Sequence, residues 1–354
     1  MSKLIISIGT LSSGGAERVL SVLATPFCDN FDEVIIVMWC KAAVFYKIDK
    51  RVKLICVEEE VGSMNDFKRM KYFRSFIQKE PPSLILSFLE PYNLRVLLST
   101  IGIKCKKVVA ERNDPRYING SWLMGMIEKT IYSLADGILV QTETIREYFN
   151  GKLAKRTKVI YNPVSLDKQL VGIALNTEKK NRIVAAARLE KQKNLEMLIK
   201  AFSVFVKKHE DFTLTIYGEG PYRNVLETLI KDLSLEGKAF LPGATKELWS
   251  QISNARCFAL SSWHEGMPNA LIEAMALGLC CVSTKVSGAC DLIKNNENGI
   301  LVELNDHESM ANAFGHIVDN QKLAENLSLN AVNIYEQLKE EVISKQWVDY
   351  LKMF

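Results

Sequence analysis

Residues 263–278 have the sequence Trp-His-Glu-Gly-Met-Pro-Asn-Ala-Leu-Ile-Glu-Ala-Met-Ala-Leu-Gly. The apolar run before them, residues 256–260, predicts a buried strand, and Pro268 predicts that a helix begins late in the stretch. Glu265 then lies in a loop and Glu273 in the first turns of the helix. Because open α/β sheets bind ligands at strand–loop–helix junctions, we expect each carboxylate to bind a different part of one extended ligand. The alternative is that both carboxylates are ordinary surface groups.

The rest of the chain alternates apolar, β-branched runs with segments of helical period, which is typical of parallel-sheet α/β domains. The strands predicted for a first sheet are residues 4–8, 34–38, 52–57, 84–88, 108–111, 137–141 and 158–161. Those predicted for a second sheet are residues 182–187, 213–217, 239–241, 257–260, 281–283 and 299–302. We therefore expect an N-terminal domain over 1–165, a polar linker over 166–181 and a C-terminal domain over 182–337, with a last amphipathic helix at about 338–354.

Length and composition agree with two globular domains. The chain has 354 residues, of which 48% are hydrophobic and 24% charged, and it contains no apolar run of transmembrane length. The apolar run at residues 4–8 fits a first strand better than a signal peptide. The eight cysteines and four histidines show no metal-binding or redox spacing, so we expect free thiols and a reducing, cytoplasmic setting.

The net charge of +4 is distributed unevenly along the chain. Residues 1–165 carry 24 Lys and Arg against 17 Asp and Glu, which is +7, and residues 166–354 carry 21 against 24, which is −3. A basic first half suits an anionic partner or a membrane surface with anionic lipids. An ordinary imbalance of surface charge is the alternative.

Two cations, Arg188 and Lys193, lie in the loop after the first strand of the second domain. If they face the same crevice as Glu265, they can neutralise a diphosphate, the guanidinium with two hydrogen bonds and the ammonium as a point charge. The alternative is a pair of solvated basic residues.

Glu265 and Glu273, with seven residues between them, and Arg188 and Lys193 upstream resemble the signature of the family-4 retaining glycosyltransferases. The resemblance implies the GT-B fold, in which two Rossmann-like, doubly wound parallel-sheet domains face each other across a cleft. It implies that Glu265 contacts the donor sugar, that Glu273 holds the ribose, and that Arg188 and Lys193 grip the diphosphate. It also implies that the C-terminal helix packs back on the first domain.

Other donor contacts follow from the same resemblance. Gly14 and Gly15, in Ser-Ser-Gly-Gly-Ala-Glu-Arg, let the backbone approach the diphosphate, and the alternative is a tight turn that needs positive φ. Gly218 and Gly243 belong to turns that shape the nucleotide pocket. The remaining donor-binding candidates form the loop and helix start between the two glutamates: Gly266, Met267, Pro268, Asn269, Ala270 and Leu271.

The acceptor-side candidates are Glu17, Glu111, Arg112 and Asn113. The last three end a predicted strand, where the resembling family often has a histidine, so the catalytic base stays open. Glu111 is one candidate for it, and an internal ion pair between Arg112 and Asp114 is the alternative use of this loop.

Residues 119–134 form an apolar, helix-like stretch with Trp122 near its start. It could contact a membrane or a lipid acceptor. Met and Leu at helical spacing usually pack inside, and we therefore expect a core helix.

The resemblance implies a metal-independent, retaining transfer of a hexose or N-acetylhexosamine from a nucleotide-diphosphate sugar, most simply a UDP-sugar. The expected acceptor is a saccharide on a polyprenyl diphosphate at the cytoplasmic membrane face, in the assembly of capsule, lipopolysaccharide or a related polymer. No metal is expected, because the chain has no Asp-x-Asp motif, and no cofactor is expected either. A nicotinamide-dependent oxidoreductase would need a full glycine fingerprint, which is absent. A non-catalytic saccharide-binding protein on the same fold is a second alternative.

Overall fold

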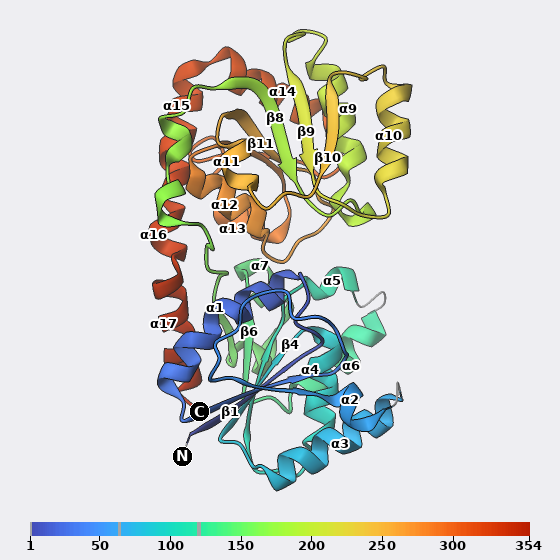
Figure 1. The fold of residues 1–354 in the computed structure, drawn as a ribbon, viewed down its shortest axis with the longest axis vertical. Helices are drawn as coiled ribbons and strands as arrows, with labels where there is room; N and C mark the ends of the chain where they lie inside the picture. The colour runs from blue at the N-terminus through green and yellow to red at the C-terminus, as the bar shows by residue number, and fades with distance from the viewer. Residues whose placement is uncertain (1, 63–64, 119–121) are drawn as a thin grey trace. The chain divides into compact units, whose positions relative to one another are not determined.

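The computed structural model describes residues 2–62, 65–118 and 122–354 (Figure 1). The chain divides into two compact units, which are treated separately below. Unit 1 comprises Met1–Pro163 and Lys339–Phe354, and unit 2 comprises Val164–Leu338.

Unit 1 is built on a seven-stranded parallel sheet of order β3-β2-β1-β4-β5-β6-β7. The chain leaves the central strand β1 toward one edge and returns to its other side at β4, which is the switch point of a doubly wound sheet. The strands are β1 (Lys3–Ile8), β2 (Glu33–Met38), β3 (Lys53–Cys56), β4 (Leu84–Phe88), β5 (Lys106–Ala110), β6 (Gly137–Val140) and β7 (Thr157–Val159).

Helices cover the sheet of unit 1 (Figure 1). They are α1 (Gly15–Asn30), α2 (Val57–Val61), α3 (Asp66–Lys79), α4 (Glu90–Ser99), α5 (Pro115–Ile118), α6 (Trp122–Tyr132), α7 (Glu143–Tyr148), α8 (Gly151–Ala154) and α17 (Glu340–Leu351). The last of these belongs to unit 1 although it closes the chain. It packs beside α1, and its buried Trp347 stacks on Phe88 with ring centroids 5.6 Å apart.

Unit 2 has a six-stranded parallel sheet of order β10-β9-β8-β11-β12-β13, which switches direction between β8 and β11. Its strands are β8 (Lys180–Ala186), β9 (Thr213–Tyr217), β10 (Ala239–Gly243), β11 (Ala255–Leu260), β12 (Cys280–Thr284) and β13 (Ile300–Val302). Its helices are η1 (Lys168–Leu170), η2 (Ile173–Leu175), η3 (Lys191–Lys193), α9 (Leu195–Phe205), α10 (Arg223–Asp232), α11 (Leu248–Ile252), α12 (Asn269–Leu277), α13 (Ser287–Leu292), α14 (His307–Asp319), α15 (Gln321–Val332) and α16 (Ile334–Leu338). An apolar core with Phe202, Phe205 and Phe314 lies between the sheet and the packed helices α9 and α14.

The predicted strands are confirmed in both sheets, with differences of a few residues at their ends. The first strand of unit 2 begins at Lys180 because that residue pairs with Ala255 of β11. Residues 166–181 hold η1, η2 and the start of β8, and they belong to unit 2.

The expectation that residues 119–134 form a core helix is wrong. Residues 119–121 lie outside the described residues, and in α6 the residues Trp122, Leu123, Met126 and Ile127 are all exposed. The buried positions of this helix are Glu128 and Tyr132. Spacing alone could not reveal this, because polar side chains occupy the inner face and form hydrogen bonds there.

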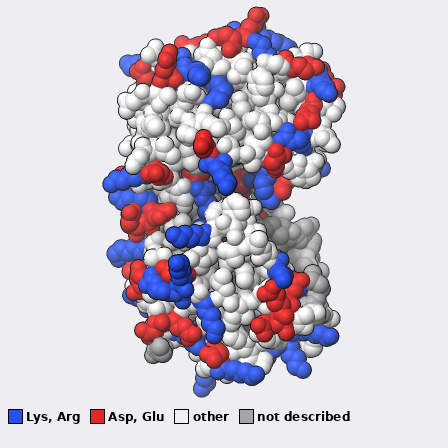
Figure 2. Space-filling view, in the orientation of Figure 1, with Lys and Arg blue, Asp and Glu red and all other residues white. Residues whose placement is uncertain are grey.

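Acidic and basic side chains are interspersed over the visible face of each unit (Figure 2). No helix in the described ranges combines the length and the hydropathy needed to cross a membrane. All eight cysteines are free thiols.

Candidate active site

The two loops that leave the switch point of unit 2 are joined to each other. The loop after β8 runs into η3, and the loop after β11 runs to Pro268, which caps α12. The amide of Trp263 donates to the carbonyl of Gln192 over 2.9 Å, and the Gln192 side chain donates to the carbonyl of His264, also over 2.9 Å. The hydroxyl of Ser261 donates to the carbonyl of Lys193 over 2.9 Å. These three hydrogen bonds hold both loops as one surface at the carboxyl edge of the sheet.

Lys193 and Glu265 form an ion pair on this surface. Lys193 Nζ lies 2.5 Å from Glu265 Oε1, and the two side chains are only 15% and 11% exposed. The hydroxyl of Ser262 donates to the same carboxylate oxygen over 2.7 Å, and Thr284, at the end of β12, in turn donates to the Ser262 carbonyl over 2.8 Å. Since solvent screens charges less at this burial, the pair presents a fixed, oriented cation and carboxylate.

The Glu265 loop leads directly into the N-terminus of α12. The Ser287 hydroxyl donates to the Glu265 carbonyl over 3.1 Å, and Gly288 lies so close that an added Cβ would stand 2.5 Å from the carbonyl oxygen of Gly266. The short run of Gly266, Met267 and Pro268 is therefore buried beneath α13. Pro268 provides no side-chain cap, so the first N–H groups of α12 form an electropositive end.

The donor-binding candidates that follow Pro268 lie on α12 itself. Asn269 and Ala270, the first two residues of the helix, are partly exposed, whereas Leu271 is buried. Glu273 follows on the same helix and is 2% exposed. Burying an ion without partners is costly, so a carboxylate at this depth needs polar partners.

Arg188 is not held with Lys193. It lies in the loop after β8, its side chain is 68% exposed, and its guanidinium pairs with Glu190 over 2.8 Å. It is therefore a solvent-exposed cation at the same edge, whereas Lys193 is largely buried in its ion pair.

Gly218 and Gly243 bring neighbouring loops of this edge together. The amide of Gly218 donates to the carbonyl of Gly243 over 3.0 Å. Gly218 has φ 140°, and a Cβ there would stand 1.9 Å from the carbonyl oxygen of Ala187. Only glycine allows this crossing of the β9 and β8 loops.

In unit 1, Gly14 and Gly15 follow β1 at the switch point of that sheet. Gly14 is the N-cap of α1 with φ −86°, so the alternative explanation, a turn that requires positive φ, is wrong. The Glu17 carboxylate instead folds back over this glycine, and an added Cβ would stand 2.0 Å from its Oε2 atom. Glu17 itself is buried.

Glu111 directly follows β5 and is completely buried. Its Oε1 atom accepts the backbone N–H groups of Arg112 and Asn113 over 3.0 and 3.3 Å, and its Oε2 atom accepts the Tyr132 hydroxyl over 2.7 Å. Burial raises the Glu111 pKa to about 8. Because both oxygens are engaged, this arrangement favours a role in fixing the loop over direct proton transfer from substrate.

Arg112 is also buried, and it does not pair with Asp114 as the alternative use of the loop required. Its guanidinium donates to Asn162, while Asp114 binds Arg116 over 2.6 Å. Burial lowers the Arg112 pKa to about 9, against the opposing effect of nearby carboxylates. The side chain of Asn113 is exposed.

Sequence patterns did not point to the residues that hold this site. They are Gln192, Ser261, Ser262, Thr284, Ser287 and Gly288. Their position after predicted strands was the one feature of the sequence that could have indicated them. Polar residues in such places face the sheet edge where the loops meet.

Comparisons with known proteins match this chain to glycosyltransferases. The family model "Glycosyl transferases group 1" matches residues 170–333. A Campylobacter jejuni protein named GalNAc-alpha-(1->4)-GalNAc-alpha-(1->3)-diNAcBac-PP-undecaprenol alpha-1,4-N-acetyl-D-galactosaminyltransferase is 27% identical, and the match covers 98% of each chain. A second protein of that organism, N-acetylgalactosamine-N,N'-diacetylbacillosaminyl-diphospho-undecaprenol 4-alpha-N-acetylgalactosaminyltransferase, is 30% identical over 91% of this chain and 92% of its own.

Among solved structures, Anabaena Alr3699/HepE in complex with UDP and glucose matches with a TM-score of 0.84 at 18% identity, and the match covers 100% of both chains. This likeness shows the fold: two parallel-sheet α/β units of the GT-B type. Together with near full-length relatives that are glycosyltransferases, it shows that the chain belongs to the group 1 glycosyl transferases and is a GT-B glycosyltransferase.

Proposed function

We propose that this enzyme transfers a hexose or N-acetylhexosamine from a UDP-sugar, with retention of configuration, to a saccharide carried on a polyprenyl diphosphate. The observation that carries the proposal is the Lys193–Glu265 pair beside the N-terminus of α12. A fixed cation and a helix N-terminus suit a diphosphate, and a fixed carboxylate suits sugar hydroxyls.

The relatives support the choice of substrates. Two of them are named as N-acetylgalactosaminyltransferases acting on undecaprenol-diphosphate-linked saccharides. The structural neighbour was solved with UDP and glucose. We propose the cytoplasmic face of the membrane as the setting, since a polyprenyl acceptor is anchored in lipid.

In the proposed step, the bond from the sugar C1 to the diphosphate oxygen breaks while the acceptor oxygen bonds to C1 on the same face. The acceptor proton passes to the departing phosphate oxygen, and UDP leaves. Lys193 stabilises the negative charge that develops on the diphosphate, and Arg188 does so when it swings in from Glu190. Glu265 positions the sugar and Glu273 the ribose.

We also propose that the donor contacts the backbone groups of four glycines, which are Gly14, Gly15, Gly218 and Gly243. Glu17, Arg112 and Asn113 stay proposed acceptor-side residues, and Glu111 is proposed to fix their loop. Because side chains and helix N–H groups supply the positive charge, we propose that the reaction needs no metal.

The test is a thermal-shift panel of UDP-, GDP- and ADP-sugars with NADH included. Bound ligand stabilises by mass action, by about 2.7 kcal/mol at one hundred times its dissociation constant, so the correct donor stands out. The proposal predicts a shift with UDP and UDP-sugars and release of UDP when a lipid-linked saccharide is added. A shift with NADH alone would indicate an oxidoreductase, and UDP binding without UDP release from any donor would indicate a binding protein.

A further inference from the structure

The helix α6 has its apolar side toward solvent. Trp122, Leu123, Met126 and Ile127 are between 45% and 75% exposed. They occupy one arc of the helix, because residues four apart lie above one another. Leu134, two residues beyond the helix, is also exposed. We call these five side chains the apolar arc.

Buried hydrogen bonds fix α6 in this orientation. On its inner face the Tyr132 hydroxyl donates to Glu111 over 2.7 Å, and Glu128 accepts the Tyr148 hydroxyl over 2.7 Å. Asn93 of α4 donates to Tyr132 over 3.0 Å. Rolling the helix to hide its apolar arc would remove these polar groups from their partners, which is costly for buried groups. The exposed apolar arc is therefore the ground state of the fold.

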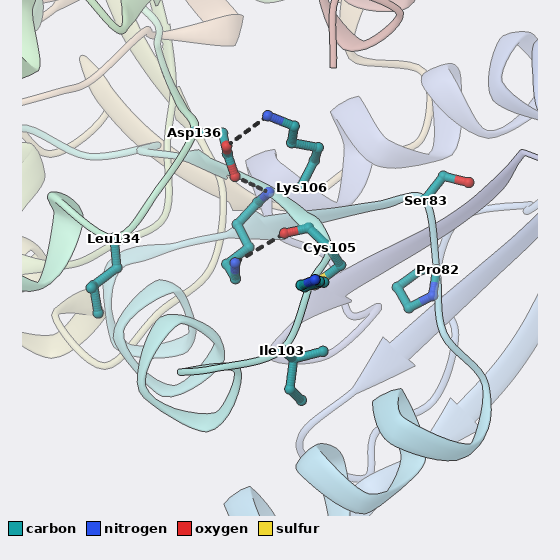
Figure 3. A pocket seen from close by; sticks show the side chains of 9 residues that line it. Pro82, Ser83, Ile103, Cys105, Lys106, Leu134 and Asp136 are labelled. Carbon is teal, nitrogen blue, oxygen red and sulfur yellow. Dashed lines mark hydrogen bonds and ion pairs between the residues drawn. The ribbon is translucent and has the colours of Figure 1, made fainter.

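A basic pocket adjoins the C-terminal end of the apolar arc, at Leu134. It has a volume of about 560 Å³, and Leu134 lies at its wall with three lysines: Lys104, Lys106 and Lys107 (Figure 3). Asp136 engages Lys106 Nζ over 3.1 Å, and Lys107 Nζ donates to the Cys105 carbonyl over 2.9 Å. One carboxylate against three ammonium groups leaves the pocket cationic.

Two further cations lie near the apolar arc. Arg156 donates to the carbonyls of Ser133 and Ala135, at the end of α6. Lys129 of α6 lies over the Tyr148 ring at 4.0 Å, so its cation stays at the helix surface. The one acidic residue of α6, Glu128, is buried. An apolar arc edged by cations is the pattern of a helix that lies in the interface of an anionic membrane.

We propose that the apolar arc of α6 and the lysine pocket beside it form a membrane-docking surface for anionic phospholipid. The arc enters the boundary between headgroups and acyl chains, and the lysines bind lipid phosphates. The proposal rests on the proposed function, since a lipid-linked acceptor requires an enzyme at the bilayer. A second copy of the chain is the less favourable occupant, because a two-fold contact through this surface would bring two clusters of lysines together.

The experiment is flotation of the full chain with phosphatidylcholine vesicles, with and without phosphatidylglycerol. Wild-type protein is expected to float with the anionic vesicles, and less so in high salt. The double variant Trp122→Ser/Ile127→Ser should reduce the partition coefficient at least about tenfold, because two apolar side chains no longer enter lipid. Lys104→Gln/Lys107→Gln should reduce binding about fivefold per lysine with anionic vesicles only.

Phe67→Ser is the matched control. Phe67 on α3 is 77% exposed, like Trp122 at 75%, and it lies outside the apolar arc, so its loss should leave flotation unchanged. The UDP thermal shift is measured for each variant and should equal that of wild type, because none of these residues is a donor contact. Flotation without a thermal shift on adding UDP would contradict the proposed function and would still support the docking surface.

Three results would overturn the docking proposal. The first is wild-type protein that stays unbound with anionic vesicles. The second is a Trp122→Ser/Ile127→Ser variant that floats as well as wild type. The third is a wild-type dimer in sedimentation velocity that this variant dissociates while neither protein floats, which would make a second copy the occupant.

Discussion

Replacing Lys193 by methionine removes the charge at the centre of the proposed site and keeps most of the side-chain volume. Lys193 Nζ is 2.5 Å from Glu265 Oε1, and both side chains are nearly covered. Loss of one preorganised group that stabilises transition-state charge costs about 2.7–4 kcal/mol, so kcat should fall roughly 10²–10³-fold. The Glu265 carboxylate of this variant keeps its hydrogen bond from the Ser262 hydroxyl.

The matched control is Lys191→Met, two residues away on the same 3-10 helix η3 and exposed. It should change kcat less than about threefold, because an exposed charge is screened by solvent. The assay is UDP release from the donor that the thermal-shift panel selects, with melting temperatures recorded for each variant. Lys193→Met activity within threefold of wild type, in folded protein, would refute the assignment of the leaving-group cation.

A double-mutant cycle separates the two roles of Lys193. If Lys193 acts partly by holding Glu265, then Lys193→Met combined with Glu265→Gln should lose less than the sum of the two single losses in free energy. Strict additivity would contradict the coupling that the ion pair implies.

Three further predictions concern pH, backbone and metal. The pKa of Glu111 is raised from 4.5 to about 8 in the folded state, which therefore binds more protons than the unfolded state between those two values. The unfolding free energy of wild type should fall as pH rises across that window, by up to about 1.4 kcal/mol per pH unit relative to Glu111→Gln. Equal pH slopes for the two proteins in urea titrations would contradict the burial argument. Gly218→Ala should lower the melting temperature of unit 2 far more than Gly237→Ala. Both glycines have positive φ, but a Cβ at Gly237 meets no atom within 4 Å, whereas a Cβ at Gly218 meets the Ala187 carbonyl. Equal losses would show that the loops after β8 and β9 move apart to accept the Cβ. Excess EDTA should leave the rate of UDP release unchanged, and loss of activity that is restored by a divalent cation would contradict the proposed role of the fixed cations.

The sequence predicted the two sheets well because their strands are buried on both faces. A continuous apolar run such as residues 34–38 has few alternatives to a parallel strand, and Pro268 marks the start of α12. The positions of Lys193 and Glu265 on adjacent loops follow from the order of the strands.

The sequence could not predict which groups form pairs across loops or which side of α6 faces inward. The separation of Arg188 from Lys193 depends on Glu190, a competitor two residues away. The inward face of α6 depends on Tyr132 meeting Glu111 on a distant strand. Hydrophobic periodicity carries no information about such polar contacts, so it predicted a core helix where the apolar side is exposed.

The central claim is that the donor binds at the switch point of unit 2, against the loops that follow β8 and β11. Hydrogen–deuterium exchange with and without saturating UDP tests it most directly, because bound nucleotide slows exchange at the amides that it covers. We predict protection in peptides spanning residues 187–194 and 261–272, with no change in peptides of α3 or α14. Protection confined to other segments, with these two loops unchanged, would contradict the account.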